Sequence, residues 1–148
     1  GGTLVTFSEA GDLAIDEFGL PVRNAVSGMW GNEFWSPGST LKVEVDTSSP
    51  FAHGMPEKAL ATYLANGQVY ETVPGARSSD VRRVVTYIDR DILQSGWLLG
   101  EAEIANKAAV VSVQHGQGTV LLIGFRAQHR AQTHGTFKLL FNALMGHS

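Results

Sequence analysis

The sequence contains no cysteine, no long apolar run and no basic cluster, and each absence excludes a class of protein. Without cysteine the chain cannot form disulfides, a thiolate nucleophile or a cysteine-ligated zinc or iron–sulfur site. No apolar stretch approaches the roughly 20 residues that a membrane-spanning helix needs. The net charge is −3, and the densest basic stretch is the pair Arg82-Arg83. We therefore expect neither a nucleic-acid nor a membrane partner.

The composition that remains is typical of one globular domain. The chain has 148 residues, of which 43% are hydrophobic and 17% are charged. This is enough apolar material for a sizeable core. No internal repeat, low-complexity tract or cofactor motif is recognisable. We treat residues 1–148 as a single domain and expect no cofactor.

The clearest local pattern lies near the C-terminal end. Two apolar runs, 110–115 and Thr119–Phe125, flank a turn with two glycines, which predicts an antiparallel pair of strands. The second run is continuously apolar, as in strands buried on both faces. After the polar loop Arg126–Gln132, a helix is predicted with Thr133 as its N-cap. Its apolar stripe consists of Phe137, Leu140, Phe141 and Leu144.

The N-terminal part predicts a strand, a tight turn and a helix, which make half of a βαβ unit. The strand is Thr3–Phe7, and an amphipathic helix then runs to Phe18 and stops at Gly19. Ser8 suits the helix N-cap. Further on, apolar and charged residues alternate over Leu41–Val45, which predicts a strand with one solvated face.

The middle of the chain is less regular. Local propensity favours a helix over Pro56–Asn66. Strands are predicted at Val69–Val73 and Arg83–Ile88, and a short helix at Leu98–Asn106. Together with the other elements, this predicts an α/β domain with a mixed sheet of roughly six to eight strands and few helices.

Several segments together resemble a known family. They are GGTLVTFSEAGDLAI, SPGSTLKVEVD, SPFAHGMP, SGWLLGE and HGQGTVLLIGFRAQHRAQTHGTFKLLFNAL. They resemble the class I glutamine amidotransferase-like domain found at the C-terminus of bacterial zinc-carboxypeptidase-family proteins. The resemblance implies a three-layer, flavodoxin-like fold, of which this chain would be a C-terminal portion, with the early strands preceding Gly1. It also favours a strand rather than a helix over Ala59–Ala65, and it suggests an exported bacterial protein.

An enzymatic role needs a nucleophile and a base. Ser8 lies at the strand-to-helix turn where class I amidotransferases carry their nucleophile, and His129 or His134 follows a later strand, where their histidine lies. However, amidotransfer requires a cysteine, and the residues around Ser8 lack the close glycines of a sharp turn. The favoured interpretation of Ser8 is a helix N-cap. A hydrolase or amidotransferase-like enzyme using Ser8 and His129 is kept as an alternative.

Two other kinds of site are disfavoured. The pair His53 and Glu57 is spaced one residue wider than the His-x-x-Glu pair of zinc carboxypeptidases, and Pro56 lies inside it. No metal site is predicted. The glycines of Gly116-Gln117-Gly118 lie between two strands rather than before a helix, so we interpret them as a hairpin turn and not a phosphate loop.

Aromatic residues supply the main candidates for binding. Trp30, Phe34 and Trp35 lie in a glycine-rich loop, where they either bind a sugar or a peptide or fold back over the end of the sheet. Trp97 is predicted to pack in the core or against another domain. Arg126 and Arg130 are candidates for an anion-binding patch.

We conclude from the sequence that the chain is a non-catalytic accessory or binding domain of an amidotransferase-like family, associated with a peptidase-like protein. A sugar- or peptide-binding module using the loop of Trp30 and Trp35 is the second alternative. Because part of the sheet would be missing, the strand Thr3–Phe7 should expose an edge or an apolar face. We therefore expect a homodimer, with a neighbouring peptidase domain as a further partner.

Overall fold

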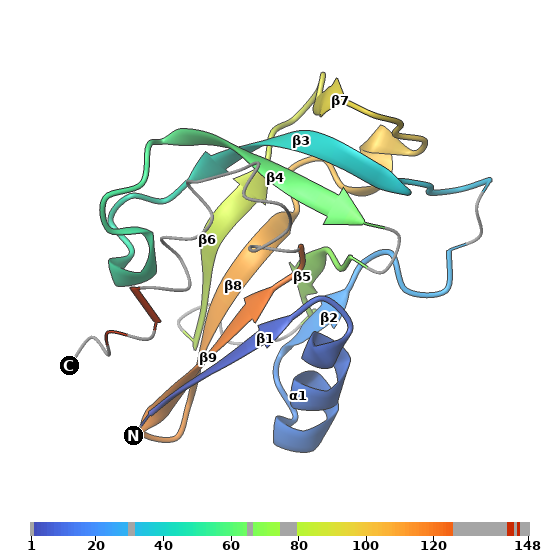
Figure 1. The fold of residues 1–148 in the computed structure, drawn as a ribbon. Coiled ribbons are helices and arrows are strands. Elements are labelled where there is room, and N and C mark those ends of the chain that lie inside the picture. Colours follow the sequence, from blue (N-terminus) through green and yellow to red (C-terminus); the bar gives the residue numbers. More distant parts are fainter. Residues whose placement is uncertain are drawn as a thin grey trace.

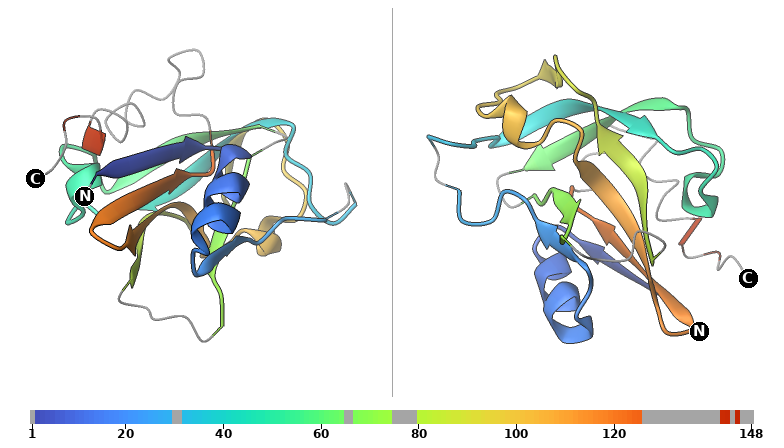
Figure 2. Two further views of the ribbon diagram at one scale, coloured as in Figure 1. Left: turned by 90° about the horizontal axis from the view of Figure 1, so that it is seen from below. Right: turned by 180° about the vertical axis from the view of Figure 1, so that it is seen from behind.

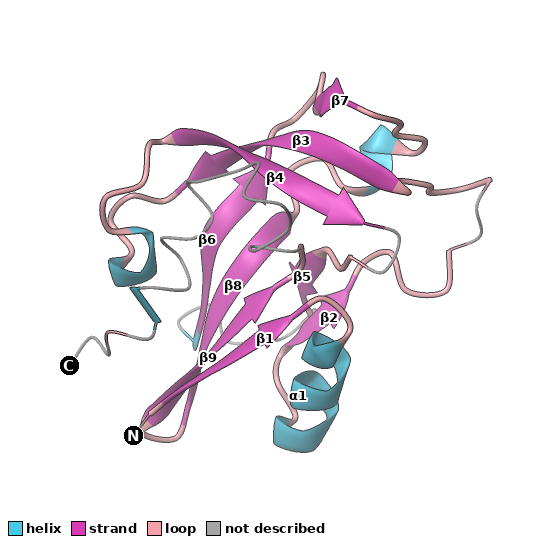
Figure 3. Cartoon of the chain, viewed as in Figure 1, coloured by secondary structure: helices cyan, strands magenta, loops and turns pink. Residues whose placement is uncertain are grey.

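A computed structural model describes residues 2–29, 32–64, 67–74, 80–125, 142, 143 and 145. The described residues form one sheet of nine strands, and one α-helix lies against it (Figure 3). The elements are, in chain order, β1 (Thr3–Phe7), α1 (Ala10–Phe18), β2 (Val22–Asn24), β3 (Gly38–Val45), the 3-10 helix η1 (Pro50–Ala52), β4 (Lys58–Leu64), β5 (Tyr70–Thr72), β6 (Val81–Tyr87), β7 (Leu93–Ser95), the 3-10 helix η3 (Glu101–Glu103), β8 (Ala108–His115) and β9 (Gly118–Ile123).

The sheet is mixed, as predicted. Its main path follows the order β1-β9-β8-β6-β3-β4, and β5 joins β2 to β8 while β7 pairs with β3 (Figure 1). β1 runs parallel to β9, and the other strand pairs of the described residues are antiparallel. In the described part of the chain β1 pairs on one side alone, so its other edge is open, as expected.

The predicted hairpin near the C-terminal end is confirmed. β8 and β9 pair from Val110 opposite Ile123 to His115 opposite Gly118. Gly116 in the turn has a φ of +59°, a backbone conformation that glycine adopts without steric cost. β8 and β9 lie in the middle of the sheet, and both of their faces are buried, which explains their nearly continuous apolar sequence.

The predicted first helix is also confirmed. α1 ends at Gly19, which takes the left-handed conformation at the C-cap and donates its N–H to Ile15 O. Its buried residues, Gly11 and Ala14, are small, so the helix axis lies close to the sheet. Figure 2 shows α1 beside the strands β1 and β2, and its residues also contact β9.

β3 connects the two halves of the sheet. The alternation noted in the sequence is visible in its burial, because Leu41, Val43 and Val45 are buried while the residues between them are more exposed. Val43 pairs with Ala59 on one side and with Tyr87 on the other. The segment that resembled a strand but had helical propensity forms β4, because its backbone completes the ladder along β3.

Two apolar clusters occupy the opposite faces of the central strands. The smaller cluster lies under α1 and includes Ala14, Val111, Val120 and Leu122. The larger one fills the other face, which β3 and β4 cross in Figure 1, and contains Leu41, Tyr63, Val110, Leu121, Ile123 and Phe125. The curling of the sheet therefore lets β3 and β4 cover a face that a flat sheet would leave to helices.

Some elements differ from the prediction. The helix predicted at Leu98–Asn106 is a single 3-10 turn, η3, because the preceding residues instead pair with the backbone at Trp35. The short strands β2 and β7 were not predicted. The predicted C-terminal helix lies mostly outside the described residues, of which Asn142 and Ala143 are helical. What is shown is a sheet-rich α/β arrangement.

Candidate functional site

The turn between β1 and α1 holds Ser8 in an unusual backbone conformation. Ser8 has a φ of +48°, its N–H donates to Ile123 O at 2.8 Å, and its carbonyl accepts from Gly11 N–H at 3.0 Å. The residue is only 5% exposed. A positive φ is uncommon for a residue other than glycine and costs about 1 kcal/mol or more.

The interpretation of Ser8 as the helix N-cap is wrong. The cap position is Glu9, and no side chain makes a cap hydrogen bond there. An N-cap residue normally has extended backbone angles, which direct its side chain towards the next N–H groups. Ser8 is instead held in the left-handed region, so the chain turns from strand to helix at this one residue.

Buried polar groups lie beside the first turn of α1. The hydroxyl of Tyr70 donates to Gln68 Oε1 at 2.8 Å, and a side chain at Gly11 would overlap both residues. Burial, with a smaller contribution from the negative charge of Asp12, raises the pKa of Tyr70 well above its ordinary value. Tyr70 therefore remains a neutral hydrogen-bond donor next to the turn at physiological pH.

The predicted partners of Ser8 are not placed. His129 and His134 lie outside the described residues, as do Arg126 and Arg130. The arrangement of Ser8 with a histidine and the anion-binding patch therefore stay predictions.

The aromatic candidates divide between core and surface. Trp30 lies outside the described residues. Phe34 is 9% exposed and packs edge-on against Tyr63, with 5.7 Å between the ring centroids. Phe34 is therefore a core residue and not a ligand contact, whereas Trp35 is 46% exposed. One of these two described rings thus folds back over the sheet and the other does not.

Trp97 was predicted to pack in the core or against another domain; the first alternative is wrong, because Trp97 is 63% exposed, and the second stays a prediction. The backbone holds this segment in place. Trp97 N–H donates to Ser39 Oγ at 3.2 Å, and Ser39 Oγ donates to Trp97 O. Since the main chain makes the contacts with β3, the indole is left pointing away from the core.

Trp35, Trp97 and Leu99 are exposed and lie on two backbone segments that pair with each other. Trp35 and Leu99 exchange two backbone hydrogen bonds, of 3.0 and 2.9 Å, and so form a directly opposed antiparallel pair. The side chains of such a pair share one face, and a residue two positions along an extended chain points the same way. We call these three residues, with the exposed Leu93 of the neighbouring β7, the aromatic surface.

The aromatic surface lies in an acidic stretch. Asp89 and Asp91 precede β7, and Glu101 and Glu103 follow Leu99, against one cation, Arg90. Glu101 also accepts a hydrogen bond from Ile92 N–H at 2.6 Å, which brings the two ends of this stretch together. The sequence signal for this surface was the tryptophan in the segment Ser-Gly-Trp-Leu-Leu-Gly, which is too short for a regular element.

A separate polar groove lies between α1 and the strands β2 and β5. It has a volume of about 680 Å³, and its walls include Asp12, Asp16, Arg23, Met29, Glu71 and Lys107. We call it the charged groove. A volume of this size is in the range of small-molecule sites.

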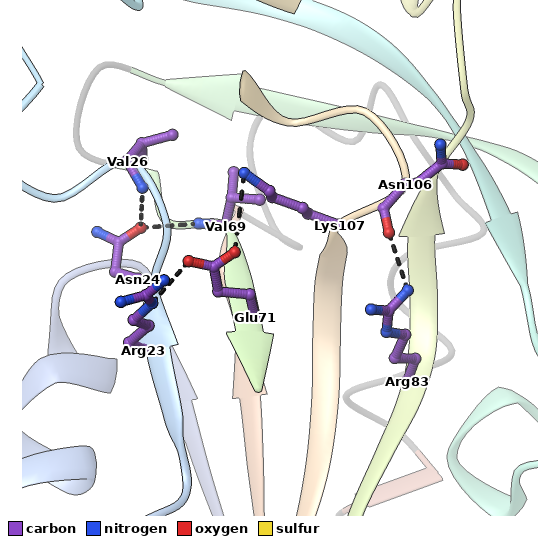
Figure 4. Close-up of polar contacts among 8 residues, drawn as sticks. All are labelled: Arg23, Asn24, Val26, Val69, Glu71, Arg83, Asn106 and Lys107. Carbon is purple, nitrogen blue, oxygen red and sulfur yellow. Dashed lines mark hydrogen bonds and ion pairs between the residues drawn. The ribbon is translucent and has the colours of Figure 1, made fainter. Parts of the chain in front are cut away.

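Glu71 lies between two cations in the charged groove (Figure 4). Arg23 Nε donates to Glu71 Oε1 at 2.6 Å, and Lys107 Nζ lies 3.8 Å from Glu71 Oε2. Arg23 and Glu71 are directly opposed in the pair β2–β5, although 48 residues separate them in the chain. No local sequence pattern indicates such a pair, which is why sequence reasoning missed it.

Asn24 fixes the adjoining wall. Its side-chain oxygen accepts from Val26 N–H at 3.3 Å and from Val69 N–H at 3.1 Å, as Figure 4 shows. These two bonds tie the turn after β2 to the segment that leads into β5. The backbone on which Arg23 and Glu71 lie is therefore held in register from both sides.

The described residues contain no group of three or more metal-ligating side chains. None of their helices is long and apolar enough to cross a membrane. No model of a known protein family matches the chain, and a search of curated proteins finds no relative.

Proposed function

We propose that the chain is a non-catalytic accessory domain that binds a polypeptide partner through the aromatic surface. The observation that carries this is the joint exposure of Trp35 and Trp97 beside Leu99. Single exposed apolar residues are ordinary, but large ones gathered together mark interaction sites, and tryptophan is enriched at the energetic centres of interfaces. The resemblance to amidotransferase-like domains of peptidase-family proteins supports a neighbouring peptidase-like region as the partner.

The surroundings favour a peptide over a sugar. Leu93 and Leu99, which belong to the aromatic surface, are aliphatic and suit apolar side chains, whereas sugars need hydrogen-bonding groups at the edges of an aromatic platform. The acidic residues Asp89, Asp91, Glu101 and Glu103 nearby favour basic flanks in the partner. The expected ligand is an apolar segment flanked by lysine or arginine.

Tryptophan fluorescence tests this proposal. Peptides with a central leucine or tryptophan flanked by lysines should shift the emission of the protein, and the same peptides with glutamates should not. The variants Trp35→Ala and Trp97→Ala should each weaken binding by about tenfold or more. Leu13→Ala is the matched control, because Leu13 is exposed on α1 and outside the aromatic surface. Binding of oligosaccharides instead of peptides, or of neither, would contradict the proposal.

A second candidate function is a hydrolase that uses Ser8. The positive φ of Ser8 at a strand-to-helix turn favours it, since nucleophiles of α/β-hydrolases occupy such a strained turn. His129 is the proposed base. A fluorophosphonate probe should then label Ser8, and Ser8→Gly should abolish the labelling while keeping the fold, because glycine adopts a positive φ readily. Absence of labelling in the folded wild-type protein argues against this candidate.

We further propose that the chain forms a homodimer through the open edge of β1. An unpaired strand edge is a template for another strand, and Leu4 on β1 is exposed. Light scattering coupled to size-exclusion chromatography should give the mass of two chains, and Leu4→Lys should give the mass of one. A monomeric wild-type protein at all concentrations would refute this expectation.

A further inference from the structure

The charged groove separates its charges into two walls. The first wall is the cluster of Arg23, Glu71 and Lys107, where two cations surround one carboxylate and leave a net positive charge. The second wall is α1, where Asp12 and Asp16 lie one turn apart and face the same groove. Neither aspartate forms an ion pair with any of the described residues. The groove therefore has a positive side and a negative side.

The positive side has hydrogen-bond donors that the cluster itself does not use. Arg23 uses its Nε to bind Glu71, and its two terminal nitrogens are not part of that bond. Lys107 Nζ, at 3.8 Å from Glu71 Oε2, is too far for a hydrogen bond, and none of the other described residues accepts one from it. The Lys107 side chain is only 28% exposed. A half-buried ammonium with unused donors favours an additional acceptor, ideally a carboxylate.

Between the charged walls the groove is partly apolar. Ile15 on α1 and Met29 at the end of the turn after β2 both line it and are half-buried. Methionine is flexible and adapts to the shape of an apolar group. A ligand side chain of aliphatic type would contact these two residues while its charged groups reach the walls.

We propose that the charged groove is a binding site for a small zwitterion that carries an ammonium and a carboxylate, as free amino acids and dipeptides do. The carboxylate binds Lys107 and the terminal nitrogens of Arg23, and the ammonium binds Asp12 and Asp16. An aliphatic side chain packs on Ile15 and Met29. This site is distinct from the aromatic surface and does not depend on the function proposed for it.

Amide NMR titration tests the proposal with leucine and with the dipeptide alanylleucine as probes. At least one of them should shift the amide signals of Asn24 and Ser27 in the groove at millimolar concentrations, with the tighter probe identifying the source as amino acid or peptide. N-acetylleucine lacks the ammonium, and leucine amide lacks the carboxylate. Each should bind about tenfold more weakly, because each loses one set of charge-assisted hydrogen bonds.

Variants then assign the two walls. Lys107→Gln should weaken the binding of leucine about tenfold and leave the binding of leucine amide unchanged. Asp16→Asn should weaken the binding of leucine but not that of N-acetylleucine. Glu17→Gln and Arg90→Gln are the matched controls, since both residues are charged and exposed but do not line the groove. Trp97→Ala should not change this binding, which separates it from the aromatic surface.

Three results would overturn the proposal. The first is the absence of any shift at about 10 mM of either probe, a concentration that detects even very weak complexes. The second is binding that is equally strong for leucine, leucine amide and N-acetylleucine, which would make the site apolar rather than zwitterionic. The third is binding that Lys107→Gln and Asp16→Asn leave unchanged while both variants remain folded by circular dichroism.

Discussion

The three tyrosines and the two described tryptophans of this protein lie in opposite environments. Tyr63, Tyr70 and Tyr87 belong to the strands β4, β5 and β6 and are buried. Trp35 and Trp97, although larger, lie in segments between strands and are exposed. Burial therefore follows the position of a residue in the sheet rather than the size of its ring. An exposed indole that the core does not need is available for contact with another molecule.

The hydroxyl groups show how the core accommodates its tyrosines. Tyr63 donates to Gly67 O at 2.8 Å, and Tyr70 donates to Gln68. The hydroxyl of Tyr87 has no partner among the described residues, so its burial costs free energy that the surrounding apolar contacts offset. The backbone groups of Trp35 and Trp97 also form hydrogen bonds, with Leu99 and Ser39. The exposure of the two indoles therefore follows from the fold and not from a loose segment.

High pH should cause the largest loss of folding stability, because it ionises the buried tyrosines. Burial raises the pKa of all three tyrosines above the ordinary value of 10.0. In the unfolded chain the tyrosines ionise near pH 10. Their contribution to the free energy of unfolding is therefore fully present below pH 10, and it is lost as the pH rises through their pKa values in the folded protein. Each tyrosine should lower the free energy of unfolding by about 1.4 kcal/mol for each pH unit above 10.

Phenolate absorbance and far-ultraviolet circular dichroism should therefore change together above pH 10, as the protein unfolds and its tyrosines ionise. The same experiment at neutral pH with urea provides the spectrum of the unfolded chain. Full phenolate absorbance near pH 10 in a protein that keeps its native circular dichroism would show that the tyrosines are accessible.

A cavity in the core should be the next largest effect. Leu122→Ala removes a buried side chain of β9 that packs under α1, and it should lower the free energy of unfolding by about 3 kcal/mol. Urea denaturation measures this change. The matched control, Leu13→Ala, removes an exposed leucine of α1 and should change the free energy by less than about 0.5 kcal/mol. Equal effects of the two substitutions would mean that α1 does not pack on β9 as described.

Removing an exposed tryptophan should have only a small effect on stability. Trp97→Ala should change the free energy of unfolding by at most about 0.5 kcal/mol, since its side chain is mostly in water and its backbone bonds to Ser39 remain. Phe34→Ala removes a buried ring next to Trp35 in the sequence and should lower the free energy of unfolding by about 3 kcal/mol. Urea denaturation of both variants tests the contrast, and a large loss for Trp97→Ala would place its indole in the core.

The smallest effect concerns a surface carboxylate. The hydroxyl of Ser48, and then Arg82, hold the pKa of Asp46 below its ordinary value of 3.8. The resulting stability is present above pH 3.8 and is lost as the pH falls through the folded-state pKa. Because the pair is solvent-exposed, Asp46→Asn should cost at most about 0.5 kcal/mol at neutral pH. Urea denaturation should show no difference from wild type in strong acid, and Glu17→Gln should show none at either pH.

Regular patterns allowed part of the fold to be predicted. The alternation in β3, the apolar runs around Gly116 and the helix that ends at Gly19 were all recognised, because each depends on residues close together in the chain. The edge of β1 that is unpaired among the described residues was expected for another reason, namely that the family resemblance implied a missing part of the sheet. The segment of β4 was assigned correctly through the family resemblance, against its own helical propensity.

The candidate sites were predicted less well. Phe34 and Trp35 were treated alike, as either ligand contacts or a cover for the end of the sheet, but Phe34 is buried and Trp35 is exposed, and Trp97 is not in the core. Composition does not reveal which residue of a loop points inward, because this depends on how its backbone bonds to another strand. Ser8 was found as a turn residue, but its positive φ and its hydrogen bond to Ile123 of β9 were not predicted.

Short-range periodicity was thus enough for the type of domain, its central hairpin and its first helix, since the backbone conformation there depends on neighbouring residues. The remaining features depend on pairing between segments that are far apart in the chain. β2 meets β5 only in the folded sheet, which opposes Arg23 to Glu71 and forms the charged groove. The segment at Leu99 meets Trp35 in the same way and exposes the aromatic surface. Contacts between residues tens of positions apart leave no local pattern, because either partner alone is compatible with many environments.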